Sequence, residues 1–95
     1  MKIFNQPIGF EWDKGNIEKN FAKHKVTNQE AEEIFFDNKK KIAQKPIKIN
    51  NENRFIAIGK TKLDRVLIIV FTLRNNKIRI ISARDAHKKE RNLYV

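Results

Sequence analysis

The spacing of apolar residues changes once along the chain, near Asp37. Before this residue the apolar positions recur at helical intervals, and after it they alternate as they do in strands. One short strand is expected ahead of the helical part, in "IGFEWD" (residues 8–13), because Phe10 and Trp12 share one side and Glu11 the other. The pattern therefore predicts an α+β domain, with most of its strands in the second half.

Two helices are expected before Asp37. In "KGNIEKNFAKHK" (residues 14–25) the apolar residues Ile17 and Phe21 lie four apart, and Asp13 can cap the segment. In "VTNQEAEEIFFD" (residues 26–37) Thr27 and Glu30 have the spacing of a capping box, which predicts that a helix begins at Asn28. Its buried side is predicted to consist of Ala31, Ile34 and Phe35.

Four strands are expected after Asp37, separated by the turns "NNEN", "TKLD" and "RNNK". Pro46 should confine the first strand to an edge or interrupt it. In "RFIAIGK" (residues 54–60) one side carries Arg54, Ile56, Ile58 and Lys60. The segment "RVLIIVFT" is apolar on both sides, as in a central strand covered on both faces. The expected order is β-α-α-β-β-β-β-α in one domain spanning residues 1–95, with the helices on one face of a mostly antiparallel sheet.

The closing segment "SARDAHKKERNLYV" (residues 82–95) predicts a helix of two to three turns. Ser82 and Asp85 have a capping-box spacing, and Asp85 is an alternative N-cap. At helical spacing four basic residues fall within about 100° of arc, and Tyr94 lies at the edge of that arc. They are Arg84, His87, Lys88 and Arg91. This side is either a phosphate-binding site or a solvated basic surface.

Charge is distributed unevenly along the chain. The net charge is +10, but residues 1–37 hold five basic and seven acidic side chains, whereas residues 38–95 hold sixteen and four. An anionic partner such as nucleic acid or an acidic protein is expected, although lysines that merely solubilise the sheet would give a similar count. The chain has no Cys, no zinc-like His spacing, no apolar run long enough to span a membrane and no signal-peptide pattern, so a cytoplasmic protein without cofactors is expected.

Four blocks, in this order and at these spacings, give the chain a family resemblance. They are "GFEWD", "NFAKHKVTNQEAEEIFFD", "RFIAIGK" and "IRIISARDAHKKERNLY", and together they cover roughly residues 10–94. The chain resembles the BrnT toxins of bacterial type II toxin–antitoxin modules. It departs from the family's usual pattern at Lys25, where a Gly is usual, at Thr27, and at Asn38, where a Pro often stands.

The resemblance implies a RelE-like fold and a ribonuclease activity that inhibits translation. It also implies a hetero-oligomer with a BrnA-type antitoxin. The antitoxin would bind DNA, and the toxin would contact DNA only indirectly, through the antitoxin. Family members match this chain at Arg54, Lys60, Arg79 and Arg84 in the sheet blocks, and at Glu90, Arg91 and Tyr94 in the last block. An acidic face of the antitoxin is expected to cover or crowd the basic sheet.

Candidate roles for individual residues follow from the chemistry of RNA cleavage without a metal. The 2′-hydroxyl attacks the adjacent phosphorus, so the protein must move two protons and stabilise phosphoryl charge. Arg54, Arg79 and Arg84 are the predicted phosphate clamp. His87 and Tyr94 are the main candidates for proton transfer. Tyr94 and Lys60 need lowered pKa values to act as bases, which the dense cationic field is expected to provide, and Glu52 is the weakest candidate. Further contacts to RNA are expected from Lys60, Arg74, Lys88 and Arg91.

Two other function classes remain open from the sequence. One is a noncatalytic module whose basic sheet holds nucleic acid; its binding would weaken steeply with salt while the RNA stayed intact. The other is a RelE- or ParE-like toxin that acts on DNA gyrase, which would halt supercoiling before protein synthesis.

Overall fold

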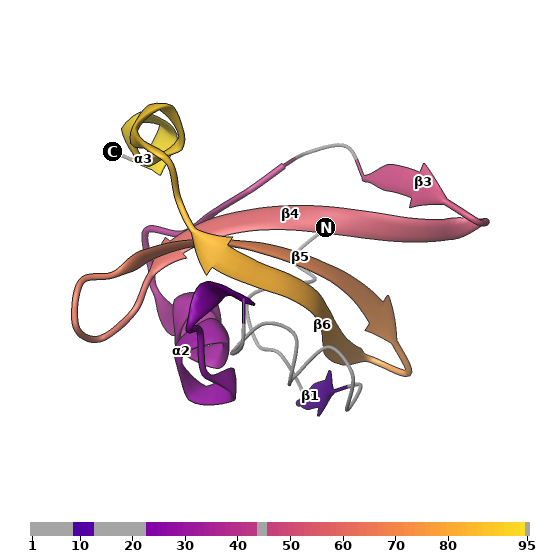
Figure 1. Cartoon of the computed structure of the whole chain (residues 1–95). Coiled ribbons are helices and arrows are strands. Elements are labelled where there is room, and N and C mark those ends of the chain that lie inside the picture. Colours follow the sequence, from indigo (N-terminus) through magenta and orange to yellow (C-terminus); the bar gives the residue numbers. More distant parts are fainter. Residues whose placement is uncertain (1–8, 13–22, 44–45, 95) are drawn as a thin grey trace.

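The computed structural model of the chain describes residues 9–12, 23–43 and 46–94. Its elements, in chain order (Figure 1), are β1 (Phe10–Trp12), α2 (Asn28–Glu33), the 3-10 turn η1 (Ile34–Phe36), β2 (Lys41–Ile42), β3 (Ile47–Ile49), β4 (Glu52–Lys60), β5 (Val66–Arg74), β6 (Lys77–Asp85) and α3 (Lys88–Tyr94). The helix expected over residues 14–25 lies largely outside the described residues, although Lys23 and His24 are helical.

The strands form a mixed sheet in the order β1-β6-β5-β4-β2, in which only the β1–β6 pair is parallel among the described strands. Strand β2 pairs with β4 at Ala57 and Ile58, and β3 pairs with β4 from Glu52 to Arg54. The strand expected around Pro46 is therefore divided into two short pieces on the edge of β4, as a proline there favours. The mostly antiparallel α+β architecture is confirmed.

Two asparagine pairs make the tight turns between strands. Asn50 and Asn51 have φ angles of 52° and 63°, and Asn75 and Asn76 have the same values. Two consecutive residues with positive φ are typical of a type I′ turn, whose twist matches that of the flanking strands, and Asn tolerates this conformation better than most residues. The turns predicted at "NNEN" and "RNNK" are confirmed, but each is only two residues long because the flanking residues already belong to strands.

The main core lies between α2 with η1 and one face of the sheet (Figure 1). The predicted capping box is present, since the Glu30 N–H donates to Thr27 Oγ1 at 3.1 Å and the Thr27 N–H donates to Glu30 Oε1 at 3.0 Å. The predicted buried side of α2 and η1 is also confirmed, with Ala31, Ile34 and Phe35 each at most 2% exposed. The 3-10 turn η1 lies so close to β4 that a Cβ on Gly59 would be 2.9 Å from Ile34 Cβ.

The last helix differs from expectation in its position and in its start. It lies on the side of the sheet opposite α2 (Figure 1), and none of its residues is buried, so the prediction that the helices share one face is wrong for α3. It begins at Lys88, because β6 continues through Asp85 and the Ala86 N–H still donates to Val66 O at 3.0 Å. Arg84 is therefore a strand residue and does not lie on the basic side of the helix.

Neither Ser82 nor Asp85 caps α3. Both belong to β6, and the Asp85 carboxylate accepts two hydrogen bonds from the Arg65 guanidinium instead. The N–H of His87, directly before the helix, donates to Glu90 Oε1 at 2.8 Å. The predicted capping of this helix by Ser82 or Asp85 is therefore wrong, because the contact at its start is made by His87 and Glu90, five positions further along the chain.

Lys25 has a left-handed backbone, with φ of 56°, directly after the helical residue His24. Such a conformation costs an L-residue roughly 1–2 kcal/mol and favours glycine. Lys25→Gly is therefore expected to raise the free energy of unfolding by about 1 kcal/mol and the Tm by about 4–8 °C. Urea and thermal unfolding measure both.

Lys25→Ala is the matched control, because it removes the same charge but keeps the Cβ atom. It should give no such gain. A Lys25→Gly variant no more stable than Lys25→Ala would show that the backbone at this position is not strained.

Candidate functional site on the open face of the sheet

The face of the sheet opposite α2, here called the open face, has an apolar centre. The predicted alternation in residues 54–60 places Ile56 and Ile58 here, and their partners on β5 are Val70 and Ile68. Basic side chains surround this centre on every strand that borders it. These seven residues, here called the cationic rim, are Lys41, Arg54, Lys60, Arg74, Lys77, Arg79 and Arg84.

Two arginines of the rim lie in one row across three strands. Thr72 on β5 pairs with Arg79 on β6, and continuing the β4–β5 register past Phe55 and Phe71 places Arg54 on the other side of Thr72. Two strand spacings put their Cα atoms roughly 10 Å apart. Both side chains are in ion pairs, Arg54 Nε with Glu52 at 3.4 Å and Arg79 Nη1 with Glu11 at 3.8 Å. Because such half-exposed pairs contribute little free energy, a phosphate can compete for these arginines.

Arg84, His87 and Glu90 form a second group at the start of α3. Arg84 Nη1 and Nη2 donate to the two Glu90 carboxylate oxygens at 2.7 and 2.8 Å, and the His87 N–H donates to the first of these oxygens. The hydrogen bond from Arg84 and then that from His87 lower the pKa of Glu90 to about 2. Glu90 therefore stays charged and fixes the position of Arg84 at the point where β6 ends.

Tyr94 belongs to a third group, at the other end of α3. Its hydroxyl donates to Asp37 Oδ2, which also accepts from the Lys60 N–H at 2.9 Å, and Lys60 Nζ lies 5.5 Å from the centre of the Tyr94 ring. Partial burial and the Asp37 carboxylate raise the pKa of Tyr94 to about 12. The expectation that the cationic field lowers the pKa of Tyr94 is wrong, because its hydroxyl contacts the negatively charged Asp37 carboxylate. At neutral pH the Tyr94 hydroxyl is therefore protonated, and Asp37 accepts that proton in a hydrogen bond.

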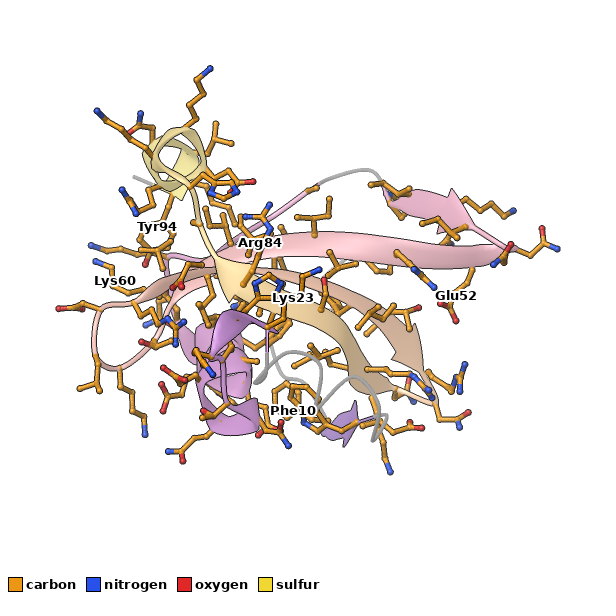
Figure 2. The ribbon with its side chains drawn as sticks, viewed as in Figure 1. Phe10, Lys23, Glu52, Lys60, Arg84 and Tyr94 are labelled. Carbon is orange, nitrogen blue, oxygen red and sulfur yellow. The ribbon has the colours of Figure 1, made fainter. Side chains whose placement is uncertain are left out.

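The predicted site is thus divided into three groups. Figure 2 shows Arg84, Lys60 and Tyr94 near α3, whereas Glu52, which pairs with Arg54 and Arg74, lies at the far end of β4. Arg79 and Arg84 are five residues apart on β6, roughly 15 Å, so one phosphate does not contact all three arginines of the predicted clamp. His87 and Tyr94 are likewise at opposite ends of α3. The remaining predicted RNA contacts, Lys88 and Arg91, are exposed on this helix.

Two residues that the sequence did not single out organise these groups. Asp37 joins Tyr94 to β4, although in the sequence it reads only as the end of a helix. Arg65 binds the Asp85 carboxylate with Nε and Nη2, at 2.6 and 2.9 Å. A single arginine at the start of an apolar strand carries no signal of such a role, since its partners come from distant parts of the chain.

In the part of the chain that the structure describes, no group of three or more His, Cys, Asp or Glu side chains is arranged to hold a metal ion. None of the described helices has the length and apolar composition needed to cross a membrane.

The fold and the cationic rim define a small basic α+β domain with one face suited to anionic ligands. Residues 12–90 match the family of the ribonuclease toxin, BrnT, of type II toxin–antitoxin systems. The chain therefore belongs to the BrnT family of ribonuclease toxins, as the four sequence blocks indicated, and membership implies an antitoxin partner.

Solved structures support the same fold. The structure of the Brucella abortus ribonuclease toxin BrnT, determined at 1.1 Å resolution, is similar with a TM-score of 0.65. The match has 23% sequence identity and covers 84% of this chain and 97% of the Brucella chain. No curated protein matches the sequence significantly.

The pKa of Tyr94 can be measured without ambiguity, because the chain has a single tyrosine. Tyrosinate absorbance near 295 nm is expected to rise with a midpoint of about 12, above the ordinary value of 10.0. Asp37→Asn removes the charged acceptor and should bring the midpoint back toward 10. Circular dichroism at each pH verifies that the protein stays folded.

Glu33→Gln removes a carboxylate from α2 that does not contact Tyr94, and it should leave the titration unchanged. A folded Asp37→Asn variant with the wild-type midpoint would contradict the assigned hydrogen bond.

The Arg84–Glu90 pair predicts a definite dependence of stability on pH. The folded pKa of Glu90 is about 2 against an ordinary 4.5, so its contribution is complete above pH 4.5 and is lost as the pH falls toward 2. Carboxyl NMR titration should give a Glu90 midpoint near 2. Arg84→Gln should move it toward 4.5.

Unfolding by urea at several pH values provides the second measurement. The stability difference between wild type and Glu90→Gln should shrink as the pH falls from 4.5 toward 2. A difference that is constant over this range would mean that the pair does not form in solution.

Proposed function

We propose that this toxin is an endoribonuclease that cuts RNA without a metal ion, acts in the cytoplasm, inhibits translation and is neutralised by a BrnA-type antitoxin. Family membership supports a ribonuclease toxin with an antitoxin. The metal-independent step and the residues assigned to it rest on the chemistry of the open face.

In the proposed reaction the 2′-hydroxyl of one nucleotide attacks the phosphorus that follows it. The 2′-oxygen–phosphorus bond forms, the bond from phosphorus to the 5′-oxygen breaks, and a 2′,3′-cyclic phosphate and a 5′-hydroxyl remain. The hydroxyl proton passes to a base, and the leaving 5′-oxygen takes a proton from an acid. No oxidant, cofactor or second substrate is needed for this balance.

The observation that carries the proposal is the Arg84–His87–Glu90 group. Glu90 engages Arg84 Nη1 and Nη2 and the His87 backbone N–H, and among the described residues Arg84 Nε has no hydrogen-bond acceptor. Arg84 is therefore held rigidly and still has a donor for a phosphoryl oxygen. His87 is exposed beside it, and its imidazole is the side chain best suited to proton transfer near neutral pH.

The row of Arg54 and Arg79 is proposed to hold a neighbouring phosphate of the same strand. Both arginines are on rigid strands, and Arg79 lies about 15 Å along β6 from Arg84, so they position the RNA backbone and do not act on the scissile phosphate. Lys60 and Arg74 extend the contact at the two ends of the rim. Tyr94, whose hydroxyl donates its single proton to Asp37, is assigned a positioning role in which it holds the end of α3 beside Lys60.

Cleavage in EDTA tests the metal-independent mechanism. Purified toxin, free of antitoxin, should cut a labelled RNA at unchanged rate in EDTA and leave cyclic phosphate ends. Arg84→Ala and His87→Ala should each reduce the rate constant about 10²–10³-fold, because one loses charge stabilisation and the other a proton-transfer group. Arg54→Gln and Arg79→Gln should chiefly raise the RNA concentration needed for half-maximal rate.

Lys89→Ala serves as the matched control, since it removes an exposed charge from the same helix outside the proposed site. It should change the rate less than threefold. If Arg84→Ala and His87→Ala both cut RNA at the wild-type rate, the catalytic assignment is wrong. RNA that is bound but stays intact would instead indicate a noncatalytic module.

A further inference from the structure

A groove lies between the open face and α3. It has a volume of about 380 Å³, and its floor is formed by Ile56, Ile58, Ile68 and Val70, with Leu93 of α3 on its wall. Leu93 is 67% exposed although it borders this apolar floor. The apolar surface continues beyond the groove onto β3, where Ile47 and Ile49 are 49% and 40% exposed and pair with open-face positions of β4.

The surroundings of this groove are strongly basic. The cationic rim contributes seven positive charges, and the carboxylates paired with it, Glu11, Glu52 and Glu90, contribute three negative ones. These ten residues give the open face as a whole a net charge of +4, and three of them, Lys41, Arg84 and Glu90, line the groove itself. The groove thus combines an aliphatic floor with an excess of cations at its edges.

This combination discriminates between the possible occupants. Nucleobases bind by stacking on aromatic rings, and no aromatic side chain lines the groove within the described chain. A second copy would bring an equally basic surface against this one, which like charges disfavour. A peptide segment with apolar side chains on one side and carboxylates on the other satisfies both the floor and the rim.

We propose that the groove beneath α3 is the docking site for an acidic amphipathic segment of the antitoxin. This inference rests on the antitoxin partner included in the proposed function. Its apolar side chains occupy the floor formed by Ile56, Ile58, Ile68 and Val70, and its carboxylates pair with Lys41 and Arg84 at the edges. Because Arg84 is in the proposed catalytic group, a segment docked here also blocks RNA, which explains inhibition without any change in the toxin's fold.

Two variants test the groove directly, Ile56→Lys on its floor and Leu93→Lys on its wall. Each adds one positive charge and removes apolar contact, so each should weaken binding of the protein encoded by the adjacent reading frame by 10-fold or more in calorimetry. Leu93 is exposed, so Leu93→Lys does not depend on repacking a core. Binding should also weaken as salt is raised from 50 to 300 mM.

The matched controls are Leu63→Lys and Phe36→Lys, at residues 91% and 67% exposed that do not line the groove. They should bind the antitoxin as wild type does. Antitoxin affinity unchanged by both groove variants, or lost only in the controls, would overturn the inference. Groove variants that bind antitoxin normally but no longer bind RNA would assign the groove to the substrate and also overturn it.

The oligomeric state of the toxin alone gives a further check. A dimer of free toxin that Leu93→Lys converts to a monomer would show that a second copy occupies the groove, contrary to the proposal. RNA cleavage is measured separately on the same variants and should stay within threefold of wild type. If the wild-type chain cuts no RNA but the groove variants still lose antitoxin binding, the docking site is supported and only the nuclease assignment is wrong.

Discussion

The arrangement of the open face depends on the guanidinium of Arg65. It binds both Asp85 oxygens, Glu30 Oε2 at 3.1 Å and the carbonyl oxygens of His24 and Lys25, and so joins the end of β6 to the start of α2. The hydrogen bonds from Arg65 lower the pKa of Asp85, and the paired carboxylates in turn raise the pKa of Arg65. With Asp85 held in the strand, the last helix cannot begin there.

The position of α3 follows from this constraint. No residue of the helix is buried, and polar contacts hold it over the sheet: Arg84 with Glu90, Lys41 Nζ with the Leu93 carbonyl at 2.7 Å, and Tyr94 with Asp37. A helix held by these polar contacts, with none of its residues buried, covers the apolar centre of the open face incompletely. The groove and its exposed Leu93 are the result, and they lie beside the arginine proposed to act on RNA.

One surface therefore serves two proposed ligands by two different interactions. RNA binds through its phosphates, which need fixed cations but no apolar floor, whereas an acidic protein segment uses both. Arg84 belongs to the edge of the groove and to the proposed catalytic group, so the two ligands exclude one another. The acidic side chains of α2, which lie toward the opposite side of the sheet, do not compete for these cations, and that separation reflects the uneven charge along the chain.

Most of the secondary-structure elements could be predicted from the sequence, because their signals are local. Local signals suffice for the capping box of Thr27 and Glu30, for the asparagine turns and for the alternation that places Arg54, Ile56, Ile58 and Lys60 on one face. The sequence did not determine where β6 ends, because that depends on Arg65, twenty residues away, and not on the Ser82 and Asp85 spacing. The separation of the predicted clamp arginines and the contact of Tyr94 with Asp37 appear only in the tertiary structure. Strand register, and a contact between residues 57 positions apart, leave no pattern in the local sequence.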